Sequence, residues 1–98
     1  MGRKNQGVKE DWPREKLFRH GPHVLSNAEL LALLLGTGAK EQTSVEIASR
    51  MLATVASIRE LAAQEVRDFT RMDGIGPGKA ARLAAAFEFG RRLPRIPR

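Results

Sequence analysis

Residues 72–81 have the sequence MDGIGPGKAA, a glycine-rich turn that is followed at once by small, helix-favouring residues. Gly74 and Gly76 permit backbone angles that side chains forbid, and Ile75 between them can fill the gap between two helices. Pro77 suits the first turn of a helix, where its missing N–H is not needed. The stretch therefore predicts two helices that are joined by a tight turn.

This turn also places free hydrogen-bond donors at one point. The backbone N–H groups of Gly76, Gly78 and Lys79 stand at the N-terminus of the second helix, where they have no acceptor within the helix. Such a helix end attracts phosphate, and glycine allows the phosphate to come close. Lys79 and Arg82 add positive charge at the same point. The predicted phosphate-binding residues are Gly74, Ile75, Gly76, Gly78, Lys79 and Arg82.

Helical signals also dominate the sequence before this turn. Capping boxes begin at Ser26, Thr43 and Ser57, because each is followed three residues later by a glutamate. No segment alternates between apolar and polar residues as a half-buried strand does. We expect an all-α fold over residues 11–93, a small bundle of five or six helices. The expected helices cover about 13–20, 27–35, 44–55, 58–62, 64–71 and 79–93.

Apolar residues indicate which helix faces are buried. The run LLALLL at residues 30–35 is apolar all round, which predicts the buried centre of the domain. Leu17 and Phe18 are expected to anchor the first helix, and Val66 and Phe69 to form the inward pair of the fifth.

Length and composition limit the classes of protein that fit. The chain has 98 residues, which favours one domain, and 42% are hydrophobic and 29% charged, as in a globular protein. There is no cysteine, so disulfides and thiol chemistry are excluded. The longest apolar run has six residues, and residues 1–9 lack the apolar core of a signal peptide. We therefore expect a cytoplasmic protein with no membrane partner.

Positive charge is concentrated at the two ends of the chain. The formal net charge is +6, and it divides into +3 for residues 1–24, −2 for residues 25–70 and +5 for residues 71–98. Such asymmetry favours a polyanion such as nucleic acid as the partner. The alternative is that the basic ends only keep the protein soluble.

The stretch LLGTG at residues 34–38 resembles a second, degenerate copy of the turn. It also ends one predicted helix and leads to another, but its loop is longer and a threonine replaces the apolar residue. The possible secondary hairpin comprises Gly36, Thr37, Gly38 and Lys40.

The 72–81 stretch resembles the helix-hairpin-helix motif of proteins that bind DNA without sequence specificity. Met72, the GIG at 74–76, the KAA at 79–81 and Leu83 carry this resemblance. Such motifs commonly act in pairs, so the fold is expected to contain a pair in which the second copy is intact and the first degenerate.

A larger part of the chain resembles the N-terminal domain of bacterial RadC proteins. The resemblance rests on five blocks in order, DWPREKL, RHG, LSNAELLA, LLGTG and GIGPGKA, at 11–17, 19–21, 25–32, 34–38 and 74–80. It implies a helical domain joined to a C-terminal JAB/MPN-like metallo-hydrolase domain with a His-x-His and Asp zinc motif, in a family assigned to DNA repair. That motif is absent from this sequence. We therefore expect an excised domain, with residues 1–10 a disordered basic arm and 94–98 a linker.

Two functions from different classes follow. The first is non-sequence-specific DNA binding through backbone phosphates, with Arg82, Arg91 and Arg92 supplying the positive field. The alternative is a protein-interaction or regulatory domain for the metallo-hydrolase domain. Salt distinguishes them, because phosphate binding releases counterions and weakens steeply as salt rises. The type of DNA and the oligomeric state stay open.

No catalytic residue, cofactor or metal is expected in this domain. After the glycine-rich turn, the sequence has Glu88 as its only acid, too little for a glycosylase of the helix-hairpin-helix type. His20 and His23 have a metal-like spacing, but the Gly-Pro between them interrupts the helix that would align them.

Overall fold

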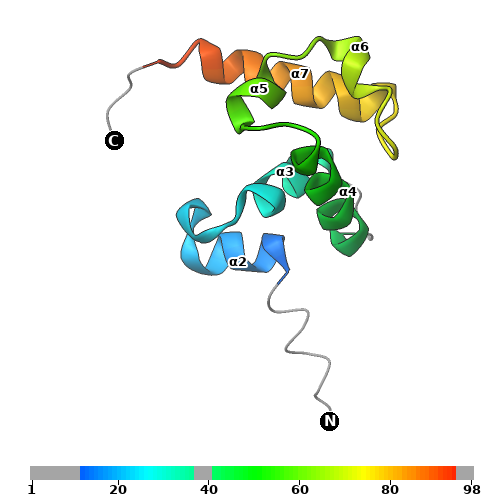
Figure 1. Ribbon diagram of the computed structural model, residues 1–98. Coiled ribbons are helices and arrows are strands. Elements are labelled where there is room, and N and C mark those ends of the chain that lie inside the picture. Colours follow the sequence, from blue (N-terminus) through cyan, green and yellow to red (C-terminus); the bar gives the residue numbers. More distant parts are fainter. Residues whose placement is uncertain (1–11, 37–40, 95–98) are drawn as a thin grey trace. The chain divides into compact units, whose positions relative to one another are not determined.

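The computed structural model describes residues 12–36 and 41–94, and all regular elements in these ranges are helices. One short 3₁₀ helix, η1, accompanies six α-helices in these ranges (Figure 1). The all-α prediction is confirmed. The elements are α2 (Pro13–His20), η1 (Pro22–Val24), α3 (Asn27–Leu35), α4 (Glu41–Ala53), α5 (Ile58–Ala62), α6 (Val66–Phe69) and α7 (Pro77–Arg91).

The chain divides into two compact units, Met1–Arg50 and Met51–Arg98, with the boundary inside α4. The single domain over residues 11–93 stays a prediction. The predicted arm at 1–10 and nearly all of the predicted linker lie outside the described residues.

In the first unit, an ion pair joins α2 to α3. Lys16 Nζ lies 2.8 Å from Glu29 Oε2, and both side chains are largely buried. The other oxygen of Glu29 accepts a hydrogen bond from the N–H of Ser26 (2.9 Å), and Ser26 Oγ accepts one from the N–H of Glu29 (3.1 Å). Glu29 therefore completes the predicted capping box of α3 and also holds α2 against α3.

The other two predicted caps differ from expectation. Ser57 Oγ accepts a hydrogen bond from the N–H of Glu60 (3.1 Å), but Glu60 accepts from Ala56 instead of Ser57 (2.8 Å). The box at Thr43 is wrong as a helix start, because α4 already begins at Glu41. Thr43 is therefore the third residue of the helix and does not precede it.

The all-round burial predicted for residues 30–35 is also wrong. Leu30 and Leu34 are exposed, because α3 turns only one face inward. The residues of α3 that are buried are Leu31, Ala32 and Leu35.

Two further apolar predictions fail in the same way. Phe18 is 84% exposed, while its neighbour Leu17 is half-buried and serves as the anchor of α2. Val66 is exposed and Phe69 is fully buried. The two residues lie three apart, on the same side of the helix, but Val66 is the first residue of the four-residue α6 and stays exposed.

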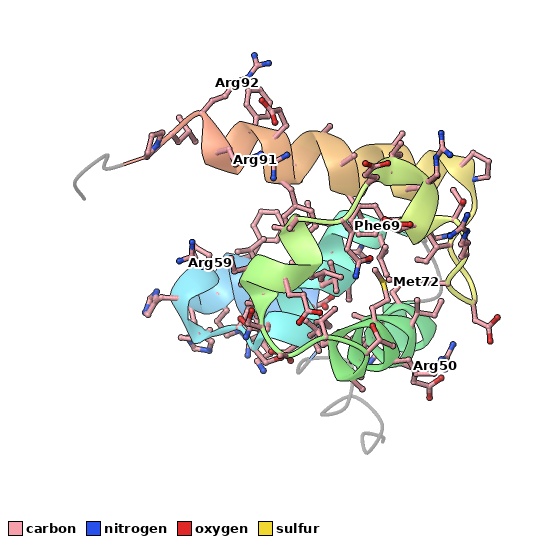
Figure 2. All side chains as sticks on the ribbon, turned by 45° about the horizontal axis from the view of Figure 1, so that its top comes forward. Arg50, Arg59, Phe69, Met72, Arg91 and Arg92 are labelled. Atoms are coloured by element: carbon pink, nitrogen blue, oxygen red, sulfur yellow. The ribbon has the colours of Figure 1, made fainter. Side chains whose placement is uncertain are left out.

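In the second unit, α6 packs against α7. The rings of Phe69 and Phe87 stack with their centroids 6.1 Å apart and their planes at 27°. Phe69, labelled in Figure 2, comes from α6. Ile75, Ala80 and Leu83 are also buried. These contacts fix the start of α7 relative to α6, and so position the turn between them.

Neutralising Glu29 tests the ion pair between α2 and α3. Burial raises the pKa of Glu29, but the hydrogen bonds from Lys16 and Ser26 outweigh burial and hold that pKa below 4.5. A carboxyl with a lowered folded-state pKa stabilises the fold above its unfolded pKa, and this contribution is lost as pH falls through the folded pKa. We expect Glu29→Gln to lower the free energy of unfolding by about 1 kcal/mol at neutral pH, as measured by urea denaturation.

In acid, well below pH 4.5, this difference from the parent should shrink. Glu46→Gln on the exposed surface of α4 is the matched control and should change stability at neither pH. Equal losses in the two variants, or a Glu29→Gln deficit that persists in acid, would contradict the role given to this ion pair.

Candidate nucleic-acid interface

The turn between α6 and α7 is held by two successive backbone hydrogen bonds. The N–H of Met72 donates to the carbonyl of Phe69, and the N–H of Ile75 donates to the carbonyl of Met72, both at 3.1 Å. Gly74 has a φ of +85°, in the left-handed region that favours glycine. The expectation of a special backbone angle is therefore confirmed for Gly74.

The same expectation is wrong for Gly76. Its φ is −87° and its ψ −174°, an extended conformation that any residue adopts. Glycine at this position therefore has no backbone explanation.

Ile75 is buried, and its N–H is already bonded to Met72. The structure thus gives this residue the shaping role inferred from the sequence. Ile75 can therefore contribute to phosphate binding only by holding the turn in place.

The N-terminus of α7 is open. Gly76 precedes the helix, Pro77 is its first residue, and the N–H of Ala80 is the donor to the carbonyl of Gly76 (3.0 Å). No side chain caps this end, whereas serines cap α3 and α5. Among the described residues, the N–H groups of Gly78 and Lys79 consequently have no acceptor. They are two donors at the positive end of a 15-residue helix.

The two glycines beside these donors border open space. A Cβ added to Gly76 or Gly78 would meet no atom within 4 Å, and neither residue has a positive φ. Glycine inside a helix costs roughly 0.5–1 kcal/mol relative to alanine. Gly78 therefore reduces stability at a position where the fold itself would accept alanine.

Charges of both signs lie close to the turn in sequence. Lys79 is half-buried in the first turn of α7, and Arg82 lies exposed one turn later. On the other side, Asp73 is exposed beside Gly74. Arg71 makes only a long ion pair with Asp68, at 3.7 Å, and both side chains are exposed.

The positions of Arg91 and Arg92 correct the prediction that they add to the field at this turn. They lie at the far end of α7 (Figure 2), about 20 Å from Gly76 at 1.5 Å per residue. That separation exceeds the Debye length of about 8 Å at physiological salt.

Both arginines also have partners at that end. Arg91 pairs with Glu88 (2.9 Å) and donates to the carbonyl of Ala62 (3.1 Å), and Arg92 pairs with the same glutamate (2.9 Å). The hydrogen bonds from Arg92 and Arg91 hold the pKa of Glu88 below its usual value. Arg91 therefore fastens α7 to α5, which lies beside this end of the helix (Figure 1), whereas Arg92 pairs within α7.

Little of the possible secondary hairpin is described. Gly36 follows α3 with a φ of +49°, and its N–H donates to the carbonyl of Ala32 (3.1 Å). Thr37, Gly38 and Lys40 lie outside the described residues. The hypothesis of a second phosphate site stays a prediction.

Residues 12–36 and 41–94 contain no cluster of three or more His, Asp or Glu side chains that could hold a metal ion. No helix in these ranges has the length and apolar character needed to span a bilayer.

Comparisons with known proteins identify relatives over most of the chain. A family model described as UPF0758 N-terminal matches residues 5–81. A UPF0758 protein of Salinibacter ruber is 48% identical over 87 residues, which cover 85% of this chain and 37% of that protein. For the Methanosarcina acetivorans protein the identity is 49% over 84 residues, 86% of this chain and 36% of the relative. A UPF0758 protein of Geobacillus kaustophilus is 45% identical over 85 residues, which cover 87% of this chain and 38% of that protein.

The chain thus spans a little over a third of the length of these curated relatives. No solved structure matches it.

Alanine substitutions separate the glycines of the turn by their effect on stability. Gly74→Ala forces a side chain into the left-handed region and should lower the free energy of unfolding by about 1–2 kcal/mol. Gly78→Ala meets open space inside a helix and should raise it by about 0.5–1 kcal/mol. Thermal denaturation by circular dichroism measures both changes. A stabilising Gly74→Ala or a destabilising Gly78→Ala would show that the two backbone conformations are wrongly assigned.

Proposed function

The chain belongs to the UPF0758 N-terminal family, and we propose that its α6–α7 turn binds DNA through backbone phosphates without reading the bases. Membership agrees, at the level of the family, with the RadC-like resemblance of the sequence. That resemblance makes DNA repair the proposed process. It also makes a JAB/MPN-like metallo-hydrolase domain the proposed covalent partner in longer relatives.

The main support for this proposal is the open N-terminus of α7. Two unbonded N–H groups, from Gly78 and Lys79, share this end with two glycines that no backbone angle or packing contact requires. A phosphate oxygen needs both features, donors that converge and an approach free of side chains. With α6 and the bonded turn before it, this is the arrangement that we interpret as a helix-hairpin-helix.

The charges support phosphate binding of modest strength. Lys79 and Arg82 attract the DNA backbone, while Asp73 beside the turn opposes them. Few phosphates are neutralised by so small a surface, so the affinity should be weak and should fall as salt rises. Such contacts position a protein on DNA and carry no sequence information.

A second candidate function is favoured by the outer face of α7. Ala81, Ala85, Phe89 and Leu93 are all exposed at four-residue spacing, with Phe89 70% and Leu93 55% exposed. Beside them lies a cavity of about 210 Å³ lined by Ala85, Glu88, Phe89 and Arg92. This stripe would suit a protein surface, for example one in the remaining two thirds of the longer relatives. Binding of that kind should respond little to salt.

Fluorescence anisotropy with labelled duplex DNA, at about 50 and 200 mM salt, tests the phosphate site. We expect Lys79→Glu and Gly78→Ala each to weaken binding about tenfold at the lower salt, the first by reversing a charge and the second by crowding the donors. Gly78→Ala should do so while the protein becomes more stable, which excludes unfolding as the cause.

Two control variants in the same unit match these changes. Gly90→Ala also adds a methyl group in open space on α7, about 18 Å from Gly78 along the helix. Arg59→Glu makes the same charge change on α5, beside the far end of α7. Both controls should bind DNA like the parent. If the controls lose as much DNA affinity as the two site variants, binding is due to a diffuse basic surface and not to the turn. If the parent binds no DNA at low salt, the exposed apolar stripe of α7 is favoured as the functional surface.

A further inference from the structure

Arg71 lies at the entry to the turn between α6 and α7, and the fold makes little use of its charge. Its side chain is 75% exposed, and its Nη1 lies 3.7 Å from Asp68 Oδ1, too far for a hydrogen bond. The arginines at the far end of α7 differ, because Arg91 and Arg92 each approach Glu88 to 2.9 Å. The guanidinium of Arg71 is therefore held only loosely by its carboxylate partner.

Asp68, the partner of Arg71, is itself held by the start of α6. Its Oδ2 accepts a hydrogen bond from the N–H of Glu65 (3.0 Å), as part of the capping box of that helix. The carboxylate cannot turn toward Arg71 without weakening this bond. A phosphate that arrives from solvent has no such constraint, and its oxygens can accept two parallel hydrogen bonds from one guanidinium. Phosphate is therefore a better partner for Arg71 than Asp68 is.

The hydrogen bonds of the turn keep Arg71 close to the beginning of α7 (Figure 1). The N–H of Arg71 donates to the carbonyl of Asp68 (3.2 Å), and the bond from Ile75 to Met72 closes the next turn of the chain. The two end residues of such a turn lie within about 7 Å of each other. Arg71 precedes Met72 and Gly76 follows Ile75, so Arg71 and Gly76 flank the same narrow turn.

We propose that Arg71 is a second phosphate-binding residue of the α6–α7 turn and that Asp68 competes with DNA for it. The amides of Gly78 and Lys79 bind one phosphate, and Arg71 binds a neighbouring phosphate. The inference rests on the proposed function, because the N-terminus of α7 determines where the first phosphate lies. Asp68 lowers the affinity for DNA, since Arg71 must leave its carboxylate before it binds the phosphate.

A purely structural role explains this ion pair less well. Exposed ion pairs contribute little to stability even at good geometry, and this pair is long. We therefore expect Arg71→Gln to leave the midpoint of thermal unfolding unchanged, so that an effect on DNA binding is not caused by unfolding.

Fluorescence anisotropy with a labelled duplex, at several salt concentrations between about 50 and 200 mM, tests the role of Arg71 in the whole chain. We expect Arg71→Gln to weaken binding about three- to fivefold at the lowest salt. It should also reduce the slope of log affinity against log salt by about one, because one phosphate fewer is neutralised. The matched control is Arg59→Gln, which removes the same charge from the exposed surface of α5 and should change neither quantity.

The same assay tests the competition by Asp68. Asp68→Asn keeps an oxygen for the N–H of Glu65 but removes the charge that holds Arg71. It should strengthen duplex binding about two- to fourfold, and this gain should vanish in a double variant that also carries Arg71→Gln. Glu60→Gln removes the same charge from α5 and should bind DNA like the parent.

Unchanged affinity and salt slope in Arg71→Gln would overturn this proposal, while losses in Gly78→Ala and Lys79→Glu would still support the α7 site. A gain in Asp68→Asn that persists in the double variant would also overturn it, because Asp68 would then act only by general repulsion of DNA. If Arg71→Gln loses affinity but Gly78→Ala and Lys79→Glu do not, the proposed function is wrong and the second contact fails with it.

Discussion

The left-handed conformation of Gly74 governs the direction in which the chain leaves the turn after α6. With φ at +85°, the backbone reverses within a few residues, and the two bonds from Met72 and Ile75 hold that reversal. Ile75 is then buried, and α7 begins at Pro77 with its positive end toward solvent. Stacking of Phe69 on Phe87 prevents the two helices from sliding apart. Without the angle at Gly74, the donors of α7 would not be presented in this way.

The glycines of this turn differ in what they contribute. Gly74 is required by the backbone, while Gly76 and Gly78 have ordinary backbone angles and empty space beside them. A residue that lowers stability with no internal compensation is typical of a functional position. That asymmetry is the strongest reason to place a ligand at the N-terminus of α7, because it does not depend on any resemblance.

Local signals in the sequence predicted the helices, but only one of the three capping boxes in full. The Ser26 box formed as expected, because its atoms lie within three residues of one another and need no tertiary context. The orientation of side chains was harder to predict. Leu30, Leu34 and Phe18 are apolar yet exposed, since the face that a helix buries depends on what packs against it. Phe18 in particular has the apolar character of a core anchor, yet its ring is 84% exposed.

At the site, residue types and spacing identified the turn, but only the structure showed that Gly74 has a positive φ and Gly76 a negative one. The φ of a glycine cannot be inferred from its identity, because glycine adopts both signs. Arg91 and Arg92 show the opposite case. Their distance from the turn follows from helix geometry alone, and their pairing with Glu88 at four residues or fewer is a local pattern.

Whether the N-terminal amides of α7 bind phosphate can be measured by a ¹⁵N-resolved NMR titration of the folded chain with a short DNA duplex. We expect the amide signals of Gly78 and Lys79 to shift first and furthest, the Gly90 signal at the other end of α7 to stay in place, and added salt to reverse the shifts. If the amide signals of Gly78 and Lys79 do not shift, while signals of exposed arginines elsewhere do, the phosphate site at this helix end is contradicted.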